Sequence, residues 1–166
     1  MSESVREMEY KTIGIIHSPF KEPKGTPIQP KGGKGVEGTV EVFPEYVEGL
    51  KDLEGFSHIV LVFHFHLAKG YSLQVKPHLD DKEHGIFATR APSRPNPIGI
   101  SVVRLERIEG NVLHIRDLDM IDGTPLLDIK PYVPEMNASE VERIGWLEGK
   151  VKKLEETADD GRFVRW

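Results

Sequence analysis

Cysteine is absent from the 166 residues of this chain, and its absence excludes several chemistries at once. The chain has no disulfides, no thiolate nucleophile and no cysteine-type zinc site. Long apolar runs are missing too, because the longest, Ile59 to Phe63, is far shorter than the roughly 20 residues that span a membrane. The opening residues, MSESVREMEYK, lack the apolar core of a signal peptide. We therefore expect a protein of the reducing cytoplasm with no membrane segment.

Familiar phosphate and nucleotide motifs are missing as well. The segment KGGKG at Lys31 to Gly35 lacks the spacing and the following hydroxyl of a phosphate-binding loop. No G-x-G-x-x-G follows a strand and opens a helix, and no G-x-S-x-G is present. In MIDGT, Met120 stands where an aspartyl-phosphate motif needs its nucleophile. These absences argue against a P-loop enzyme, a Rossmann domain, an aspartyl phosphatase and an α/β-hydrolase.

Positive charge is too scarce for a protein that grips nucleic acid over its whole surface. The formal net charge is −5, whereas such proteins are usually strongly basic. Four lysines nevertheless fall within fifteen residues: Lys21, Lys24, Lys31 and Lys34. They either form a local basic patch on an acidic body or belong to a solvated loop.

What the chain does contain is a series of short alternating segments, which predict strands. They cover Tyr10 to Ile16, Thr39 to Phe43, Ser57 to Leu67, Ser72 to Val75, Gly85 to Thr89, Ile98 to Ile108, Val112 to Arg116 and Leu126 to Ile129. Short helices are expected at Glu45 to Leu53 and Trp146 to Glu156. The pattern predicts a mainly β fold, a single closed or nearly closed β-barrel with a few short helices. We expect this domain to cover 10–151, between a flexible N-terminus (1–9) and a short charged tail (152–166).

The most informative segment is FATRAPSRPNPIGI, from Phe87 to Ile100, which holds three prolines. Proline fixes φ and removes an N–H donor, so the segment is stiff and is neither a helix nor an inner strand. It carries Arg90, Arg94 and Asn96 on this rigid frame. Guanidinium groups match carboxylates, phosphates and base edges. The segment is either a proline-rich turn with solvated arginines or, as we expect from its density of polar groups, a binding loop.

The histidines His58, His64 and His66 share one side of their predicted strand. His64 and His66 would suit a metal pair in a barrel. A cupin-like site would need a glutamate three or four residues later, where Lys69 and Gly70 stand instead. The alternatives are polar side chains on a half-buried strand, or a small-molecule pocket in which His66 contacts the ligand. We expect no metal.

A second polar segment, Asp117 to Pro134, reads DLDMIDGTPLLDIKPYVP. Asp122 precedes a Gly-Thr-Pro turn and is either a capping residue of that turn or part of a site. Asp128, Lys130 and Tyr132 follow at a period of two. In an extended chain they would share a face with Thr124 and Leu126, and would form a polar network or a site there.

At these residues the chain resembles a known family. The segments ATRAPSRPNPIGIS, DGTPLLDIKPYVP and GFSHIVLVFHFH, with Ile13 to Phe20 and Pro27 to Pro30, closely resemble the TsaA/TrmO family from about Lys11 to Asn137. The resemblance implies a single β-barrel, and a homodimer that binds S-adenosylmethionine near the subunit interface. It also implies methyl transfer to the N6 nitrogen of threonylcarbamoyl-adenosine beside the anticodon of tRNA.

The resemblance also implies roles for individual residues. The cofactor site would draw on Gln29, Pro30, Lys31, His66, Leu67, Arg90, Ile100, Leu118, Asp119, Met120 and Ile121. Arg94, Asn96 and Lys130 are the candidates for holding the modified nucleotide and its phosphate. Asp122, Asp128 and Tyr132 are the candidates for polarising the attacking nitrogen.

Two alternatives come from other classes of protein. One is a barrel that binds S-adenosylmethionine or a nucleotide without catalysis. The other is a metal-dependent barrel enzyme that uses His64 and His66.

Overall fold

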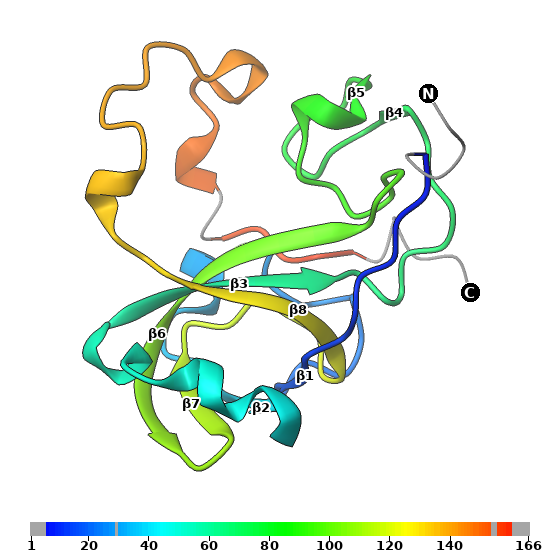
Figure 1. Ribbon diagram of the computed structural model, residues 1–166. Coiled ribbons are helices and arrows are strands. Elements are labelled where there is room, and N and C mark those ends of the chain that lie inside the picture. Colours follow the sequence, from blue (N-terminus) through cyan, green and yellow to red (C-terminus); the bar gives the residue numbers. More distant parts are fainter. Residues whose placement is uncertain (1–5, 29, 154–155, 161–166) are drawn as a thin grey trace.

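Six antiparallel strands close into a barrel in the computed structural model, which describes residues 6–28, 30–153 and 156–160 (Figure 1). Around the barrel the order is β1-β2-β7-β6-β3-β8, and β8 pairs back with β1. The strands are β1 (Gly14–His17), β2 (Glu37–Val42), β3 (His58–His64), β6 (Ile98–Glu109), β7 (Val112–Arg116) and β8 (Thr124–Pro131). The predicted fold class is therefore confirmed.

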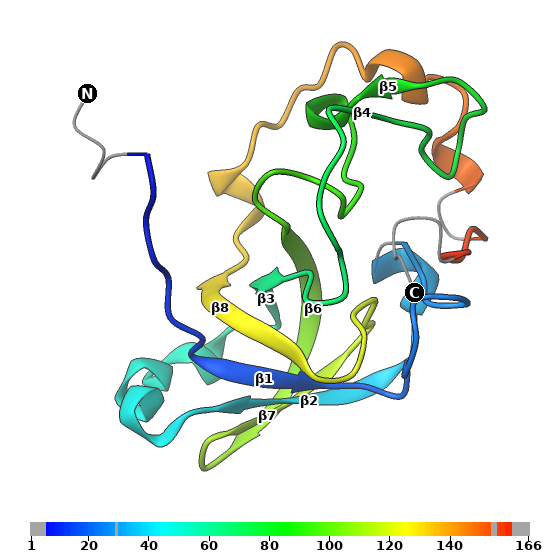
Figure 2. The same cartoon turned by 90° about the vertical axis from the view of Figure 1, so that its right-hand side faces the viewer.

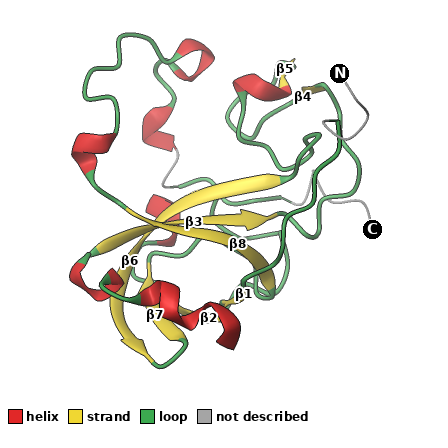
Figure 3. Ribbon diagram, viewed as in Figure 1, coloured by secondary structure: helices red, strands yellow, loops and turns green. Residues whose placement is uncertain are grey.

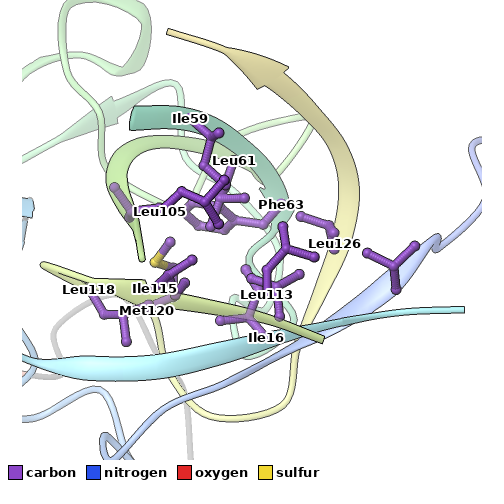
Figure 4. Packing of buried hydrophobic residues seen from close by; sticks show 13 residues of the cluster. Ile16, Ile59, Leu61, Phe63, Leu105, Leu113, Ile115, Leu118, Met120 and Leu126 are labelled. Atoms are coloured by element: carbon purple, nitrogen blue, oxygen red, sulfur yellow. The ribbon is translucent and has the colours of Figure 1, made fainter. Parts of the chain in front are cut away.

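The barrel is filled by alternate residues of its strands, as a period of two requires. In β3 the fully buried residues are Ile59 and Leu61, followed by Phe63, while the residues between them are only partly buried. Side chains from the other strands, and two from the segment between β7 and β8, complete one continuous core (Figure 4): Ile16, Val40, Val42, Val103, Leu105, Leu113, Ile115, Leu118, Met120 and Leu126. Burial of these apolar side chains is the main stabilising contribution to the barrel.

Strand β8 contains an irregularity that changes which way its side chains face. Consecutive residues of β3 pair with Asp128 and with Leu126, so β8 carries one extra residue, a β-bulge. Thr124 and Leu126 are buried, whereas Asp128 and Lys130 lie on the outer face of the barrel. The prediction that all these side chains share one face is wrong, because the bulge shifts the period of two by one residue.

The short helical elements are all 3₁₀ turns in the described residues (Figure 3). The helix predicted at Glu45 to Leu53 is two such turns, η3 (Pro44–Leu50) and η4 (Leu53–Gly55). The others are η2 (Pro30–Gly33), η5 (Ile86–Ala88), η6 (Pro134–Met136), η7 (Gly145–Leu147) and η8 (Val151–Lys153). The helix predicted at Trp146 to Glu156 is wrong in the residues that the structure describes, because Gly149 has φ 77° and interrupts it between η7 and η8; residues 154 and 155 of that prediction lie outside the described residues. The strand predicted at Gly85 to Thr89 is mostly η5.

A lobe formed by residues 65–97 lies over one end of the barrel (Figures 1 and 2). It contains a two-stranded ribbon, β4 (Gln74–Val75) with β5 (His84–Gly85), and a small core of Val75, Ile86 and Ala91. No helix among the described residues has the length and apolar character to cross a membrane.

The chain after β8 passes along this lobe and then returns to the first long loop of the protein (Figure 2). Ala158 forms a β-bridge with Pro27. The Gly25 N–H donates to the Asp159 carbonyl and the Asp159 N–H donates to the Thr26 carbonyl, both at 2.6 Å. The described part of the predicted charged tail is thus paired with the loop at 25–27.

Candidate functional site

A cavity of about 890 Å³ lies between the end of the barrel and the lobe. Six parts of the chain line it: the first loop, the end of β3 with the turn after it, the connection between β4 and β5, the proline-rich loop leading into β6, the segment before β8, and the chain after β8. Its volume is near the upper end of the roughly 300–1,000 Å³ typical of small-molecule sites, and most of its lining is apolar.

The floor of the cavity is built by the segment between β7 and β8. Asp117 has φ 70°, a left-handed conformation, and its carboxylate accepts a hydrogen bond from the Gly35 N–H at 2.7 Å. After this turn the side chains alternate. Leu118 and Met120 are buried in the barrel core, whereas Asp119 and Ile121 line the cavity.

Asp119 is a largely buried carboxylate at this floor. The hydroxyl of the buried Ser101, on β6, donates to its Oδ1 at 2.7 Å. Burial raises the pKa of Asp119 to about 6, against the lowering influences of the Ser101 hydrogen bond and the Arg90 charge. The cavity therefore holds a carboxylate that changes protonation state close to neutral pH.

Arg90 and His66 supply the other polar groups of the cavity wall. Arg90 is exposed and stands close enough to Asp119 to act on it by charge. Burial lowers the pKa of His66, and the neighbouring His64 lowers it further. At neutral pH the wall thus combines a cation, a carboxylate and a neutral imidazole that can donate or accept a hydrogen bond.

The proline-rich loop is held by its own side chains. The hydroxyl of the buried Thr89 donates to the Ile86 carbonyl at 2.9 Å and accepts from the Ala91 N–H at 3.2 Å. The Arg94 guanidinium donates from Nη1 to the carbonyls of Thr89 and Ala91, both at 3.0 Å. Arg94 lines the cavity, and part of its donor capacity stiffens the loop that carries Arg90.

The chain after β8 forms another part of the wall, through Trp146, Leu147 and Asp159. The Trp146 indole N–H donates to the Ala88 carbonyl at 2.7 Å, and its ring stacks on His84 with centroids 4.6 Å apart. Nearby, Lys150 reaches Asp80 at 3.1 Å, and His84 reaches the same carboxylate at 2.8 Å. The contacts from His84 and then Lys150 hold the pKa of Asp80 well below its usual range.

The cofactor residues expected from the family resemblance fall into three groups. His66, Leu67, Arg90, Ile100, Asp119 and Ile121 line the cavity together. The side chains of Leu118 and Met120 belong to the core, and the Met120 carbonyl accepts from the Ser18 hydroxyl at 2.7 Å. Pro30 and Lys31 lie in η2, and Gln29 lies outside the described residues.

The three residues predicted to polarise the nitrogen do not form one site within a single chain. Asp122 accepts hydrogen bonds from Lys21 at 2.8 Å and from the Ser18 N–H at 3.0 Å, beyond one end of β8. Asp128 lies midway along the outer face, and Tyr132 follows the other end. The eight residues of β8 alone span roughly 26 Å. Among the described residues that line the cavity, none of the three is present.

The three predicted nucleotide contacts also separate. Arg94 lines the cavity, and Asn96 is exposed in the same loop. Lys130 lies on the outer face of β8, where it pairs with Asp128 at 2.9 Å.

His64 and His66 find no third metal ligand in the part of the chain that the structure describes. His64 ends β3, and His66 follows in the turn at the cavity. The group of three potential ligands that does occur there joins His78 to Asp159 and Asp160, at 3.8 and 3.9 Å from the imidazole. These contacts link the lobe to the returning segment.

Sequence reasoning missed several residues of the cavity. Ser101 looks like one polar position in an alternating strand, and nothing marks it as the partner of a carboxylate 18 residues later. Trp146 could have been noticed, because the indole N–H of a buried tryptophan usually forms a hydrogen bond. Phe87, at the start of the proline-rich loop, also lines the cavity.

Together these features define a class: a small closed β-barrel with a mostly apolar cavity at one end that contains a few polar groups and has a volume typical of small-molecule sites. The chain belongs to the family of the tRNA-methyltransferase O N-terminal domain, whose profile matches residues 15–138. Trp146, Leu147 and Asp159 follow the matched region and still contribute to the cavity.

Individual relatives are also similar. A probable S-adenosyl-L-methionine-binding protein of Pyrococcus abyssi is 66% identical over 154 residues, which are 93% of this chain and 84% of the relative. The tRNA (adenine(37)-N6)-methyltransferase of Escherichia coli is 38% identical over 136 residues, 76% of this chain and 58% of that enzyme. The crystal structure of TrmO from Pseudomonas aeruginosa superposes with a TM-score of 0.70 at 42% identity, over 84% of this chain and 62% of that one. This chain thus spans about three fifths of these two longer relatives.

Proposed function

We propose that this protein transfers a methyl group from S-adenosylmethionine to the N6 nitrogen of an adenine in tRNA. The observation that carries this proposal is the cavity, which sets Asp119 and Arg90 close together in a mostly apolar lining. Family membership supports it, as do relatives named as S-adenosyl-L-methionine-binding proteins and as tRNA (adenine(37)-N6)-methyltransferases.

The polar groups of the cavity match the charges of S-adenosylmethionine. The cofactor carries a carboxylate, an ammonium and a sulfonium, and its adenosine has donors on the base and ribose. Arg90 is suited to the carboxylate, while Asp119 is suited to an ammonium or to ribose and base donors. His66 can bind a base edge in its neutral form. When bound, the cofactor supplies an electrophilic methyl group.

The chain's own residues then have three tasks: to orient the nitrogen, to exclude water and to release a proton. The rigid loop around Arg90 and Arg94 orients, and orientation alone contributes several kcal/mol. The apolar lining and Trp146 keep the reacting atoms from water. The N6 proton becomes strongly acidic only as the nitrogen gains its methyl group, so it leaves late and needs no strong base.

The finer substrate of this proposal is threonylcarbamoyl-adenosine at position 37, beside the anticodon, in the cytoplasm. The family resemblance motivates it, and the printed name of the Escherichia coli relative includes adenine 37. A threonylcarbamoyl group carries a carboxylate, for which Arg94 in the cavity wall is a suitable partner.

We further propose that the protein is a homodimer, joined through the outer face of β3 and β6. Ile98 and Ile100 are 37% and 53% exposed there. By register Ile100 pairs with Val62 and Val102 pairs with Val60, so the apolar side chains are contiguous. Contiguous exposed apolar patches are typical of protein interfaces. Analytical ultracentrifugation should give a dimer for the wild type and a monomer for Val60→Lys; a monomeric wild type would contradict this proposal.

A dimer of this kind would also give the outer-face residues a place near a site. Asp128 and Lys130 lie on the same outer face, beside β3. A second copy seated on that face would bring both to the interface. If the single-turnover rate of an Asp128→Asn, Tyr132→Phe double variant equals that of the wild type, these side chains have no role in polarising the nitrogen.

Two measurements test the proposed function. Calorimetry should detect binding of S-adenosylmethionine and of S-adenosylhomocysteine, which a metal-dependent enzyme has no reason to bind. Transfer of labelled methyl to total tRNA then separates an enzyme from a binding barrel. Arg90→Ala should weaken cofactor binding roughly tenfold or more, since a charged hydrogen-bond partner is lost. Arg107→Ala is the matched control, because Arg107 is an exposed β6 arginine that pairs with Glu109 at 2.6 Å and does not line the cavity.

A further inference from the structure

Phe87 is a large apolar side chain that the fold leaves open to solvent at the cavity. It lines the cavity and is nevertheless 77% exposed. The other two phenylalanines of the lining, Phe63 and Phe65, pack edge to face on one another at 5.4 Å. Phe87 therefore stands at the open side of the cavity, where burying its ring would require something other than the described chain.

The backbone that presents Phe87 is firmly held on both sides. Ile86, before it, is fully buried, and its N–H donates to the Leu73 carbonyl at 2.9 Å. Ala88, after it, accepts the Trp146 indole hydrogen bond at 2.7 Å. An exposed ring on a fixed backbone loses little conformational freedom when a ligand covers it, which favours binding.

The surroundings of Phe87 fit a nucleic-acid base better than they fit the cofactor. Arg94, from the same loop, lines the same cavity, and its guanidinium can pair with an anionic group of the RNA substrate. Leu73 and Tyr71, on the same lobe, are 62% and 59% exposed. A cofactor bound inside the cavity is surrounded by buried side chains. A ring at the rim instead contacts the part of a larger RNA substrate that does not enter the cavity.

We propose that Phe87 is a stacking platform for an unpaired base of the RNA substrate at the mouth of the cavity. Proteins that read single-stranded RNA loops stack splayed bases on exposed aromatic rings. Stacking is tolerant of base identity, so Phe87 contributes affinity and orientation while the groups within the cavity select the adenine. This inference rests on the proposed function, since it assumes an RNA substrate.

The test measures binding of a fluorescent tRNA anticodon stem-loop by anisotropy, in the presence of S-adenosylhomocysteine. Phe87→Ala should weaken binding about tenfold, the size of one lost base–aromatic stack. Phe87→Tyr should restore binding, because the ring is kept. Phe87→Leu should not, because it keeps only apolar area. Tyr10→Ala is the matched control, since Tyr10 is 72% exposed and does not line the cavity.

Several results would contradict the stacking role of Phe87. Wild-type affinity for Phe87→Ala or Phe87→Leu would overturn the stacking role. Loss of S-adenosylhomocysteine affinity, by calorimetry, would place Phe87 in the cofactor site instead and would also overturn it. A monomer for Phe87→Ala and a dimer for the wild type would assign the ring to a subunit interface, and would also overturn the stacking role. If the wild type itself binds no stem-loop, the proposed function fails first, which separates the two failures.

Discussion

Replacing Asp119 by asparagine should make the protein more stable while it removes cofactor binding. Asparagine keeps an oxygen for the Ser101 hydroxyl, which now lies 2.7 Å from the carboxylate, and it removes the buried charge. Burial raises the pKa of Asp119 from its ordinary 3.8 to about 6. At about 1.4 kcal/mol per pH unit, the ionised carboxylate costs the folded state roughly 3 kcal/mol.

The pH dependence of this difference follows from its sign. In the wild type the pKa of Asp119 is higher in the folded than in the unfolded state. The contribution of Asp119 to the free energy of unfolding is therefore fully present below pH 3.8 and is lost as the pH rises through about 6. Asp119→Asn should therefore match the wild type near pH 4 and exceed it above pH 7. For a chain of 166 residues the gain near pH 7.5 corresponds to roughly 6–12 °C in thermal midpoint.

Urea unfolding followed by tryptophan fluorescence at pH 4 and pH 7.5 measures the difference. The control is Asp128→Asn, a surface carboxylate paired with Lys130 at 2.9 Å, for which we expect a change below about 1 kcal/mol. Calorimetry should show loss of cofactor binding for Asp119→Asn alone. An Asp119→Asn variant that is less stable at pH 7.5, or a difference independent of pH, would refute the reasoning.

Two further predictions concern carboxylates that link segments distant in sequence through hydrogen bonds and ion pairs. Hydrogen bonds from Lys21 and then from the Ser18 N–H hold the pKa of Asp122 below its usual range, so its stabilisation is present above pH 3.8 and lost in acid. Asp122→Asn should lower the thermal midpoint at neutral pH, converge with the wild type in acid and keep the single-turnover rate; a slowed rate would return Asp122 to the reaction. Asp80→Asn should speed tryptic cleavage after Lys152 by releasing the segment after β8, and an unchanged cleavage rate would show that Asp80 does not hold it.

The barrel could be predicted because its strands obey a period of two over a buried face. The strand predicted at Ile98 to Ile108 matches β6 almost residue for residue, and the turn at Gly110 follows it as expected, with φ 61°. The bulge in β8 could not be predicted, because it depends on the pairing with β3. Because of the bulge, Leu126 points into the barrel while Asp128 points outward. In an uninterrupted strand both side chains would have been on the same face.

The candidate site was predictable where the sequence is distinctive. The proline-rich loop with Arg90 does line a cavity, which fits the binding loop that its density of polar groups led us to expect. The role of Ser101 arises only when β6 and the segment before β8 meet. Trp146 is held at the cavity by its hydrogen bond to the carbonyl of Ala88, which lies 58 residues earlier in the sequence. Such contacts join segments that have no local relation, so no pattern within either segment reveals them.

The most direct test of the proposed function is mass spectrometry of tRNA nucleosides after incubation with the protein and S-adenosylmethionine. The substrate is tRNA that carries threonylcarbamoyl-adenosine and no methyl group on it. We expect the modified adenosine to gain the mass of one CH₂, with fragmentation that locates the methyl group on N6. An unchanged nucleoside, or a methyl group at another atom, from protein that binds the cofactor would contradict the account.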